Sequence, residues 1–390
     1  MSAVDFPHLL AETRRISREV AAVHADAVDR EARFPAETLA ALKAARLLSA
    51  PAPVALGGSG CTMGELGQLA SVLAQGCASS AMVLVMHWIQ LACVARHTPA
   101  TGFWGDWQRR QAAEQWLLAS ITSEVGTWGD TRSSRCAPER DATHFRLAKD
   151  ATTGSYCADA DVILVTCRRH AEAAASDQLL LLLQRGQYTL EQTTTWDTLG
   201  MRGTCSPGFR IDGRAPLEQI LPVDYADISA QSMVPYSHIL WSALWTGIAA
   251  EAHARAAAFV RAQARKAPGT VPPTAQALAH LTVEMQSLRH HWQSVAHEFD
   301  ALPADAGQAA AALGQMGWAL KFNSLKIACS EKTPQVVHGA LQIVGILGYK
   351  NDGPHSLGRL YRDALSGALM VSNERVASRS ANLLLVFKDE

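Results

Sequence analysis

Three glycine-containing segments of the chain carry polar side chains at spacings that could do chemistry. The first runs from Ser123 to Asp130 and reads SEVGTWGD. The second, from Asp197 to Ser206, reads DTLGMRGTCS, and the third, from Gln342 to Tyr349, reads QIVGILGY. Hydroxyls and backbone N–H groups in such loops donate hydrogen bonds, and a glycine lets the backbone approach a ligand where a Cβ atom would clash. The first and third segments therefore indicate a binding site, and the second a tight connection between strands.

In this order the segments resemble the motifs of the acyl-CoA dehydrogenase family. The family patterns are T-E-P-G-x-G-S-D, L-G-M-R-G-T/S-x-S and Q-x-x-G-G-x-G-Y/F, the last followed by an Arg-Asp pair that is Arg362-Asp363 here. A weaker resemblance places Lys149, Thr152 and Thr153 at the family's G-x-K-x-W-I-T, with Ala151 in place of the tryptophan. The resemblance covers essentially the whole chain and implies a flavoprotein oxidoreductase that binds FAD.

The resemblance also implies which residues would hold the cofactor. The Ser123 loop and Thr153 would lie against the flavin ring, where fixed donors stabilise the electron density that the ring gains on reduction. Gln342 would bond the ADP portion, usually that of the neighbouring subunit, and Arg265 stands where the family's R-x-x-F-G is no longer intact. The expected cofactor-binding residues are Ile121, Ser123, Gly129, Thr153, Arg265, Gln342, Gly345, Gly348 and Asn373.

The base that defines the family's chemistry is not found at its usual place. Dehydrogenation of an acyl thioester requires a group that removes the α-proton while a hydride leaves for the flavin. Counting eight residues from Asp363 reaches Val371, which cannot accept a proton. Two other catalytic residues are expected: Glu374, or His238, which stands beside Ser237, the residue at the position where a minority of the family carries the base. Ser237, Val371 and His87 are expected to line the substrate site, although a packed histidine and a solvated glutamate are the ordinary alternatives.

The composition excludes several classes of protein. Of 390 residues, 48% are apolar and 18% charged, and the net charge of −1 argues against binding to nucleic acid or to an anionic membrane. The most apolar stretch, Ala81 to Ala95, is interrupted by His87 and Gln90 and is too short for a membrane span. The N-terminus lacks the pattern of a signal peptide, so a cytoplasmic protein is expected. Eight cysteines without a C-x-x-C pair indicate buried free thiols and no metal site.

The hydrophobic pattern of the chain predicts the helices and strands that position these residues. Helical periodicity predicts a helical domain over residues 1–117, including one long helix from Met63 to about His97. Alternating and continuous apolar runs predict an antiparallel β domain over 118–228, with two short strands around turns at Pro207-Gly208 and Asp212-Gly213. Helical spacing then returns and predicts a four-helix bundle over 229–390. The fold class is therefore α+β, similar to that of acyl-CoA dehydrogenases.

Three functions remain open from the sequence. The first is a dehydrogenase acting on the CH–CH group of an acyl-CoA or acyl-carrier-protein thioester, with a carrier protein or an electron-transfer flavoprotein as partner, assembled as a homodimer or homotetramer. The second is a flavin-dependent monooxygenase on the same scaffold, which needs no α-proton abstraction. The third is a homologue that keeps the fold but not the redox role.

Overall fold

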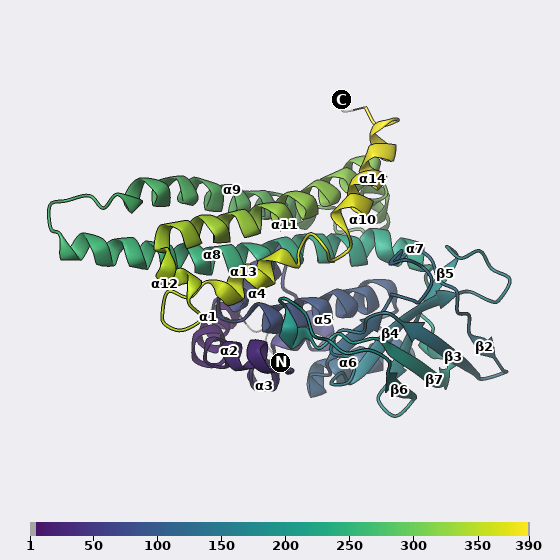
Figure 1. The fold of residues 1–390 in the computed structure, drawn as a ribbon. Helices are drawn as coiled ribbons and strands as arrows, with labels where there is room; N and C mark the ends of the chain where they lie inside the picture. The colour runs from purple at the N-terminus through teal and green to yellow at the C-terminus, as the bar shows by residue number, and fades with distance from the viewer. Residues whose placement is uncertain (1–4, 389–390) are drawn as a thin grey trace.

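The computed structural model describes residues 5–388, in the order helices, strands, helices (Figure 1). The N-terminal helices are α1 (Phe6–Ile16), α2 (Ala22–Glu31), α3 (Ala36–Ala44), α4 (Met63–Gly76), α5 (Ala78–His97) and α6 (Gly102–Glu114). The strands are β1 (Leu118–Ile121), β2 (Glu139–Arg140), β3 (His144–Ala151), β4 (Val162–Arg168), β5 (Gln178–Gln184), β6 (Tyr188–Gln192) and β7 (Phe209–Pro216). The C-terminal helices are α7 (Tyr225–Ile228), α8 (Val234–Lys266), α9 (Thr274–Asp300), α10 (Ala306–Leu313), α11 (Met316–Val344), α12 (Ile346–Tyr349), α13 (Gly358–Leu365) and α14 (Asn373–Leu384). This order confirms the predicted α+β class, while the domain boundaries at 117/118 and 228/229 stay predictions.

The stretch from Met63 to His97 forms two helices, so the prediction of a single helix was wrong. Cys77 has an extended backbone, with φ −152° and ψ 113°, and separates α4 from α5. A Cβ atom on Gly76 would lie 2.3 Å from the carbonyl oxygen of Ser17, so the chain must pass the Ser17–Ala21 turn closely at this point. Thr62 caps the N-terminus of α4 in a capping box. Its hydroxyl accepts from the Glu65 backbone N–H, and the Glu65 carboxylate accepts from the Thr62 backbone N–H.

Helix α5 is the central helix of the N-terminal part. It packs against α4, α8 and β1. Within residues 5–388 it alone is long and apolar enough to cross a membrane, but 89% of the qualifying window is buried inside the protein. Its apolar surface is therefore accounted for by the core. Of the eight free cysteines, five are buried (Cys77, Cys93, Cys157, Cys167 and Cys329), as the sequence predicts for those five.

The β domain consists of two packed sheets. One has the order β1-β4-β5, with β1 parallel to β4, and the other is antiparallel with the order β2-β3-β7-β6. Strands β4 and β5 are buried on both faces because alternate residues meet different layers. Leu164 and Leu182 pack with Trp104 of α6, whereas Val165 and Leu183 join the core that includes the second sheet. This arrangement explains the continuous apolar runs in the sequence.

The predicted turn at Asp212-Gly213 is not present. Strand β7 runs without interruption from Phe209 to Pro216 and pairs with β3 along its whole length. A Cβ atom on Gly213 would lie 2.6 Å from Leu183 Cδ1, so the glycine allows the two sheets to approach. An Asp-Gly pair was interpreted as a turn signal, but here it serves packing.

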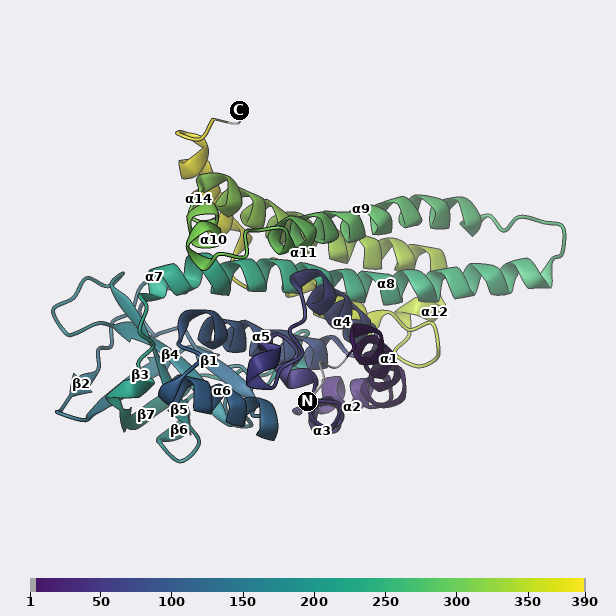
Figure 2. The same ribbon diagram turned by 180° about the vertical axis from the view of Figure 1, so that it is seen from behind.

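The C-terminal helices form an elongated bundle. Helices α8, α9 and α11 run side by side, and α8 also packs against α4 and α5 (Figures 1 and 2). Gly247 allows the crossing of α8 over α4, since its Cβ atom would lie 2.3 Å from Ser71 O. The β domain and α14 lie towards one end of the bundle, and α12 and the α8–α9 connection lie towards the other (Figures 1 and 2).

Candidate functional site

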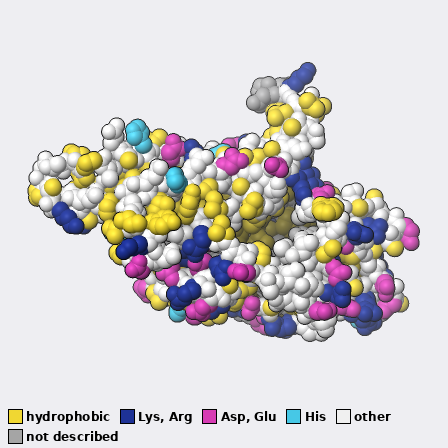
Figure 3. All heavy atoms as spheres, in the orientation of Figure 1, with side chains coloured by type: hydrophobic (Ala, Val, Ile, Leu, Met, Phe, Trp, Pro, Cys, Tyr) yellow, Lys and Arg dark blue, Asp and Glu magenta, His cyan; other side chains and the backbone are white. Residues whose placement is uncertain are grey.

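A hollow opens between the C-terminal helices and the β domain, with hydrophobic side chains at its bottom (Figure 3). Where these two parts meet, α14 contacts the loop that follows β1. Arg375 Nη2 donates to the carbonyl oxygen of Trp128 at 2.5 Å, and Arg379 Nη2 donates to Asp130 Oδ1 at 2.8 Å. Two segments that are far apart in the sequence are thus brought together, and we take the hollow beside them as the candidate site.

Ser123 and Thr153 lie next to each other in the loops that follow β1 and β3. The Ser123 hydroxyl donates to Thr153 O at 2.9 Å and accepts from Thr153 N–H at 3.1 Å. The two hydroxyl oxygens are 3.3 Å apart, and both side chains retain exposed surface. Because the one Ser123 proton is used by Thr153 O, the Thr153 hydroxyl is the member of this pair that remains able to donate to a ligand.

A buried ion pair supports this loop from below. The Glu124 carboxylate accepts from the N–H groups of Arg135 at 2.9 Å and Cys136 at 2.7 Å, and Lys149 Nζ lies 3.8 Å away. Lys149 also donates to Thr166 O at 2.7 Å, and burial lowers its pKa. Ile121 is fully buried at the end of β1, so its side chain packs in the core and only its backbone could contact a cofactor, which stays a prediction.

The tip of the same loop has an unusual backbone. Trp128 has φ +54° and a side chain that is 90% exposed, and Gly129 follows with φ +78°. A Cβ atom on Gly129 would lie 3.3 Å from Arg375 Nη1. Glycine at 129 therefore gives the guanidinium of α14 access to the loop.

Residues 366–373 form the turn that leads into α14 together with the first residue of that helix, and two predicted residues in this segment contact one buried lysine. Val371 has φ +50°, and its carbonyl oxygen accepts from Lys326 Nζ at 3.1 Å. Asn373 Oδ1 accepts from the same ammonium at 2.5 Å, and Asn373 Nδ2 donates to Glu331 Oε1 at 2.9 Å. The amide of Asn373 is thus engaged by the protein, whereas Glu374 is exposed on the first turn of α14.

His238 lies on α8 and is 5% exposed. Its Nδ1 donates to Phe322 O at 3.1 Å, which places the lone pair on Nε2, and no residue in the described part of the chain bonds that nitrogen. Burial, together with the charge of Lys326, lowers the pKa of His238 to about 3, so the imidazole is neutral and a hydrogen-bond acceptor. The neighbouring Ser237 is buried and donates within its own helix, to Val234 O at 3.0 Å.

His87 does not line the hollow, which corrects the prediction for this residue. It is fully buried in α5, where Nε2 donates to Leu48 O at 2.8 Å and Nδ1 accepts from Leu118 N–H at 2.9 Å. Burial lowers the pKa of His87 to about 4. Because both ring nitrogens bond the backbone, His87 ties α5 to β1 and takes the structural role.

The remaining predicted residues lie at the other end of the bundle. Arg265 and Gln342 are exposed near the ends of α8 and α11, and Gly345, with φ +67°, connects α11 to α12. Eighteen residues of α11, roughly 27 Å, separate Lys326 from Val344. Within one chain, Gly345 and Gly348 therefore lie far from the Ser123 loop, and their role in cofactor binding stays a prediction.

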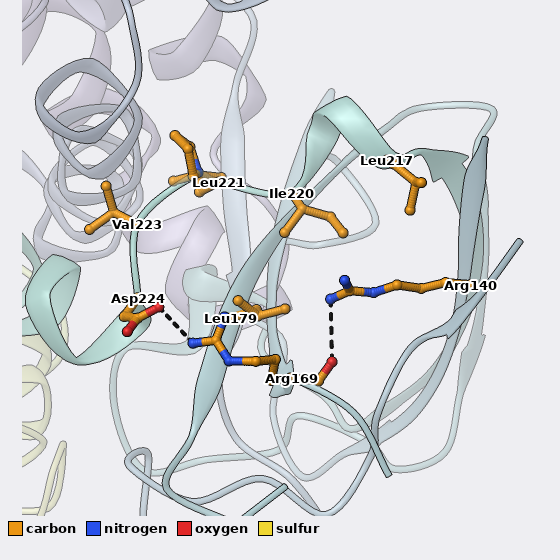
Figure 4. Close-up of a pocket in the computed structure, with 9 residues that line it drawn as sticks. Arg140, Arg169, Leu179, Leu217, Ile220, Leu221, Val223 and Asp224 are labelled. Carbon is orange, nitrogen blue, oxygen red and sulfur yellow. Dashed lines mark hydrogen bonds and ion pairs between the residues drawn. The ribbon is translucent and has the colours of Figure 1, made fainter. Parts of the chain in front are cut away.

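Two other pockets lie in the β domain. One, of about 320 Å³, has an apolar wall that includes Leu179 and Ile220 and two arginines at its mouth (Figure 4). There Arg169 pairs with Asp224 at 2.6 Å, and Arg140 donates to Arg169 O at 3.3 Å. The other, of about 630 Å³, lies beside Glu124. In residues 5–388 no group of three His, Cys, Asp or Glu side chains is arranged to hold a metal ion.

The sequence matches two family models. Residues 7–100 match the acyl-CoA dehydrogenase N-terminal domain, and residues 229–370 match the acyl-CoA dehydrogenase C-terminal domain. The chain belongs to the acyl-CoA dehydrogenase family. No curated protein matches the sequence well enough to count as a relative.

Solved structures of this family show the same fold at low identity. FMN-bound TdsC from Paenibacillus sp. A11-2, a dibenzothiophene monooxygenase, is 18% identical, with 98% of each chain covered and a TM-score of 0.83. A nitrososynthase from Micromonospora carbonacea var. africana is 20% identical, with 99% and 98% covered and a TM-score of 0.81. A glutaryl-coenzyme A dehydrogenase complex is 18% identical, with 97% and 95% covered and a TM-score of 0.79. The fold thus serves both dehydrogenases and oxygen-using enzymes.

This acyl-CoA dehydrogenase relative keeps the family's second motif because the motif joins three parts of the fold. Met201 N–H donates to the buried Asp363 at 2.6 Å, and burial raises the pKa of that carboxyl to about 6. Arg202 donates to Asp29 O at 2.7 Å, and Arg362 pairs with the Asp29 carboxylate. A Cβ atom on Gly200 would lie 2.3 Å from Arg362 O. We call this contact of residues 198–203 with 359–363 and α2 the domain junction.

Lys326, Arg375 and Arg379 were not among the residues predicted for the site. A signal for Lys326 was available, because it stands on the buried stripe of α11 that also carries Phe322, Cys329 and Thr333. A lysine on such a stripe is rarely fully buried without a partner. No comparable signal marked the two arginines, which become neighbours of the Ser123 loop only through the fold.

Proposed function

We propose that this chain is a flavin-dependent monooxygenase. The observation that carries the proposal is the absence, among the described residues, of a carboxylate at the position of the family's base. Val371 occupies that position, and the charged group nearest to its backbone is the Lys326 ammonium. An ammonium cannot accept an α-proton, whereas oxygen insertion does not require a carboxylate base.

The residues around the hollow fit the ring of a flavin. The Thr153 hydroxyl and the backbone of the loop after β1 would provide donors on the side of the β domain, and the bottom of the hollow is apolar. A bound reduced flavin would supply the two electrons with which one oxygen atom of O₂ enters the substrate and the other leaves as water. The Nε2 atom of His238 would accept a hydrogen bond from a substrate O–H or N–H group and so orient it.

The flavin is proposed to be FAD shared between two copies of the chain in a homodimer or homotetramer. Arg265 at the end of α8, Gln342 at the end of α11, and Gly345 and Gly348 at α12 belong to the end of the bundle opposite α14 and the β domain. They would reach the ADP portion of a cofactor bound in a second copy, as the family resemblance implies. FMN is the second candidate, because Ile346 replaces one family glycine and the FMN-bound TdsC shares the fold.

The experiment compares the oxidised and reduced flavins. Purified protein is mixed with FAD or FMN in either redox state under argon, binding is followed by flavin fluorescence or absorbance, and oxygen is then added. Preferential binding of reduced flavin, followed by oxygen consumption, supports a monooxygenase, and mass spectrometry of the bound flavin distinguishes FAD from FMN. A protein that binds neither flavin would overturn the proposal and leave a homologue without a redox role.

One observation favours an acyl-thioester dehydrogenase as the second candidate. His238 has its Nδ1–H fixed by Phe322 O and an unshared lone pair on Nε2, the arrangement of a general base. In that case an acyl-CoA or acyl-carrier-protein thioester would be the substrate and an electron-transfer flavoprotein a partner. Bleaching of a tightly bound oxidised flavin by acyl-CoA under argon would identify this reaction. Loss of the bleaching in His238→Gln would assign the base.

A further inference from the structure

Lys326 is an unusual residue for the interior of a helical bundle. Its side chain is fully buried, and no carboxylate oxygen of the described residues lies within 4.0 Å of its ammonium. Its two acceptors are neutral, namely the backbone carbonyl of Val371 and the side-chain carbonyl of Asn373. A buried charge without an ionic partner is costly, so a lysine in this position needs an explanation beyond stability.

One acceptor, Val371, lies in the turn before α14, and the other, Asn373, is the first residue of α14. Val371 is β-branched and has φ +50°, a conformation that such residues rarely adopt. Two charge-assisted hydrogen bonds from one ammonium hold this residue and the first residue of α14. Through α14 the turn is connected to the Ser123 loop, because Arg375 and Arg379 contact that loop one and two helical turns later.

We propose that Lys326 is a positioning residue that holds the 366–373 turn, and through α14 the Ser123 loop, in the conformation that receives the flavin. Lys326 does not touch the cofactor in this arrangement, since it is fully buried. The inference rests on the proposed function in that it takes the hollow as the flavin site. It goes beyond that function by assigning a role to a residue that stands in contact with the position of the family's missing base.

The titration of Lys326 supplies a second test. Burial lowers the pKa of its ammonium to about 8, although Glu331 opposes the shift. The other charged or titratable groups on the surrounding elements are His238 of α8, Arg132 of the loop after β1, and Glu374 and Arg375 of α14. Loss of the ammonium proton above about pH 8 removes the charge from both hydrogen bonds and is expected to loosen the turn.

The experiment measures amide hydrogen exchange of the flavin-free protein, corrected for intrinsic rates, in peptides that cover residues 366–376. Lys326→Met keeps the length of the side chain but removes the donors, and we expect at least tenfold faster exchange in these peptides. Lys332→Met is the matched control, because Lys332 lies on the same helix and pairs with the Glu284 carboxylate at the surface. We expect no change in the 366–376 peptides of the control.

The pH series separates positioning from general stabilisation. In the native chain, corrected exchange of the 366–376 peptides should rise between pH 7 and pH 9, whereas in Lys326→Arg, which stays charged, it should remain flat. Flavin affinity should fall about tenfold in Lys326→Met. Unchanged exchange in Lys326→Met, or equal acceleration across the whole chain, would overturn the inference. If Lys326→Met loosens the turn but the native chain binds no flavin, the positioning of the turn stands and the proposed function fails.

Discussion

The domain junction and the 366–373 turn both contain backbone that favours glycine or requires it, but only the junction has glycine there. At the junction, Gly200 stands where any Cβ atom would meet the backbone of Arg362. In the turn, a valine occupies a left-handed conformation in which glycine would be unstrained. The junction has no room for variation because three parts of the fold meet there. In the turn, the Val371 carbonyl accepts from Lys326, so a side-chain contact rather than close backbone packing meets the chain there.

Replacing Gly200 with valine should give the largest effect. The new side chain would meet backbone atoms of Arg362 and Asp363 that cannot move independently, and we expect a loss of about 4 kcal/mol or more in the free energy of unfolding. Urea unfolding followed by circular dichroism measures this loss. Gly317→Ala on α11 is the control, because its Cβ atom would make only ordinary contacts, at 3.6 Å. A stable Gly200→Val protein would show that the junction is less rigid than its geometry implies.

Acid should destabilise the protein through three buried histidines of α5 and α8, outside the two regions compared. Burial lowers the pKa of His87 and His97 to about 4 and that of His238 to about 3. Below pH 6.5 these imidazoles therefore bind protons in the unfolded chain but not in the folded chain. Their contribution to the free energy of unfolding is present above pH 6.5 and is lost as the pH falls.

The expected decline is about 1.4 kcal/mol per pH unit for each imidazole, or about 2 kcal/mol between pH 6.5 and 5. In His238→Gln the free energy of unfolding should fall by about 2 kcal/mol less between pH 6.5 and pH 5 than in the native protein. Urea unfolding at each pH measures this difference. An identical pH dependence in the native and substituted proteins would mean that His238 is protonated equally in both states.

Arg202→Met should have an intermediate effect at the junction. The guanidinium donates to Asp29 O, Asp197 Oδ1 and Thr198 O, each at 2.7 Å. Their loss should lower the free energy of unfolding by about 1–3 kcal/mol and leave flavin affinity unchanged. Arg146→Met removes an exposed pair with Asp212 on the sheet surface and should cost less than about 1 kcal/mol. Weakened flavin binding in Arg202→Met would show that the junction and the site are coupled.

Val371→Gly should have the smallest effect on stability. Glycine relieves the strain of the left-handed backbone but loses side-chain packing and gains freedom in the unfolded chain, so we expect a net change below about 1 kcal/mol. Calorimetry or urea unfolding measures this change. A loss of several kcal/mol would mean that the Val371 side chain, rather than Lys326, fixes the turn.

The sequence predicted the order of the elements and the family because these depend on local patterns. The apolar periodicity of α8 and α11 and the continuous runs of β4 and β5 each record how many faces of an element are buried. The errors have local physical causes. Cys77 interrupts a helical pattern because Gly76 meets Ser17, and Asp212-Gly213 lies inside a strand because Gly213 meets Leu183.

The candidate site was only partly predictable. Ser123 and Thr153 are adjacent, and their motifs were recognisable from the sequence. His87 has the residue type of a catalytic group, but both of its nitrogens bond the backbone. Residue type shows which chemistry is possible, whereas hydrogen-bond partners decide whether it is available.

By itself the sequence determined the α+β fold, the family and the loss of a proton acceptor at position 371, because each follows from residue types and their spacing. Only the tertiary structure decided that Lys326 takes hold of that position and that the glycines of the third motif lie at the other end of the bundle. The physical reason is that burial and long-range contacts determine the charge of a side chain, its hydrogen-bond partners and the groups it can reach. Burial and long-range contacts cannot be read from the local spacing of residues.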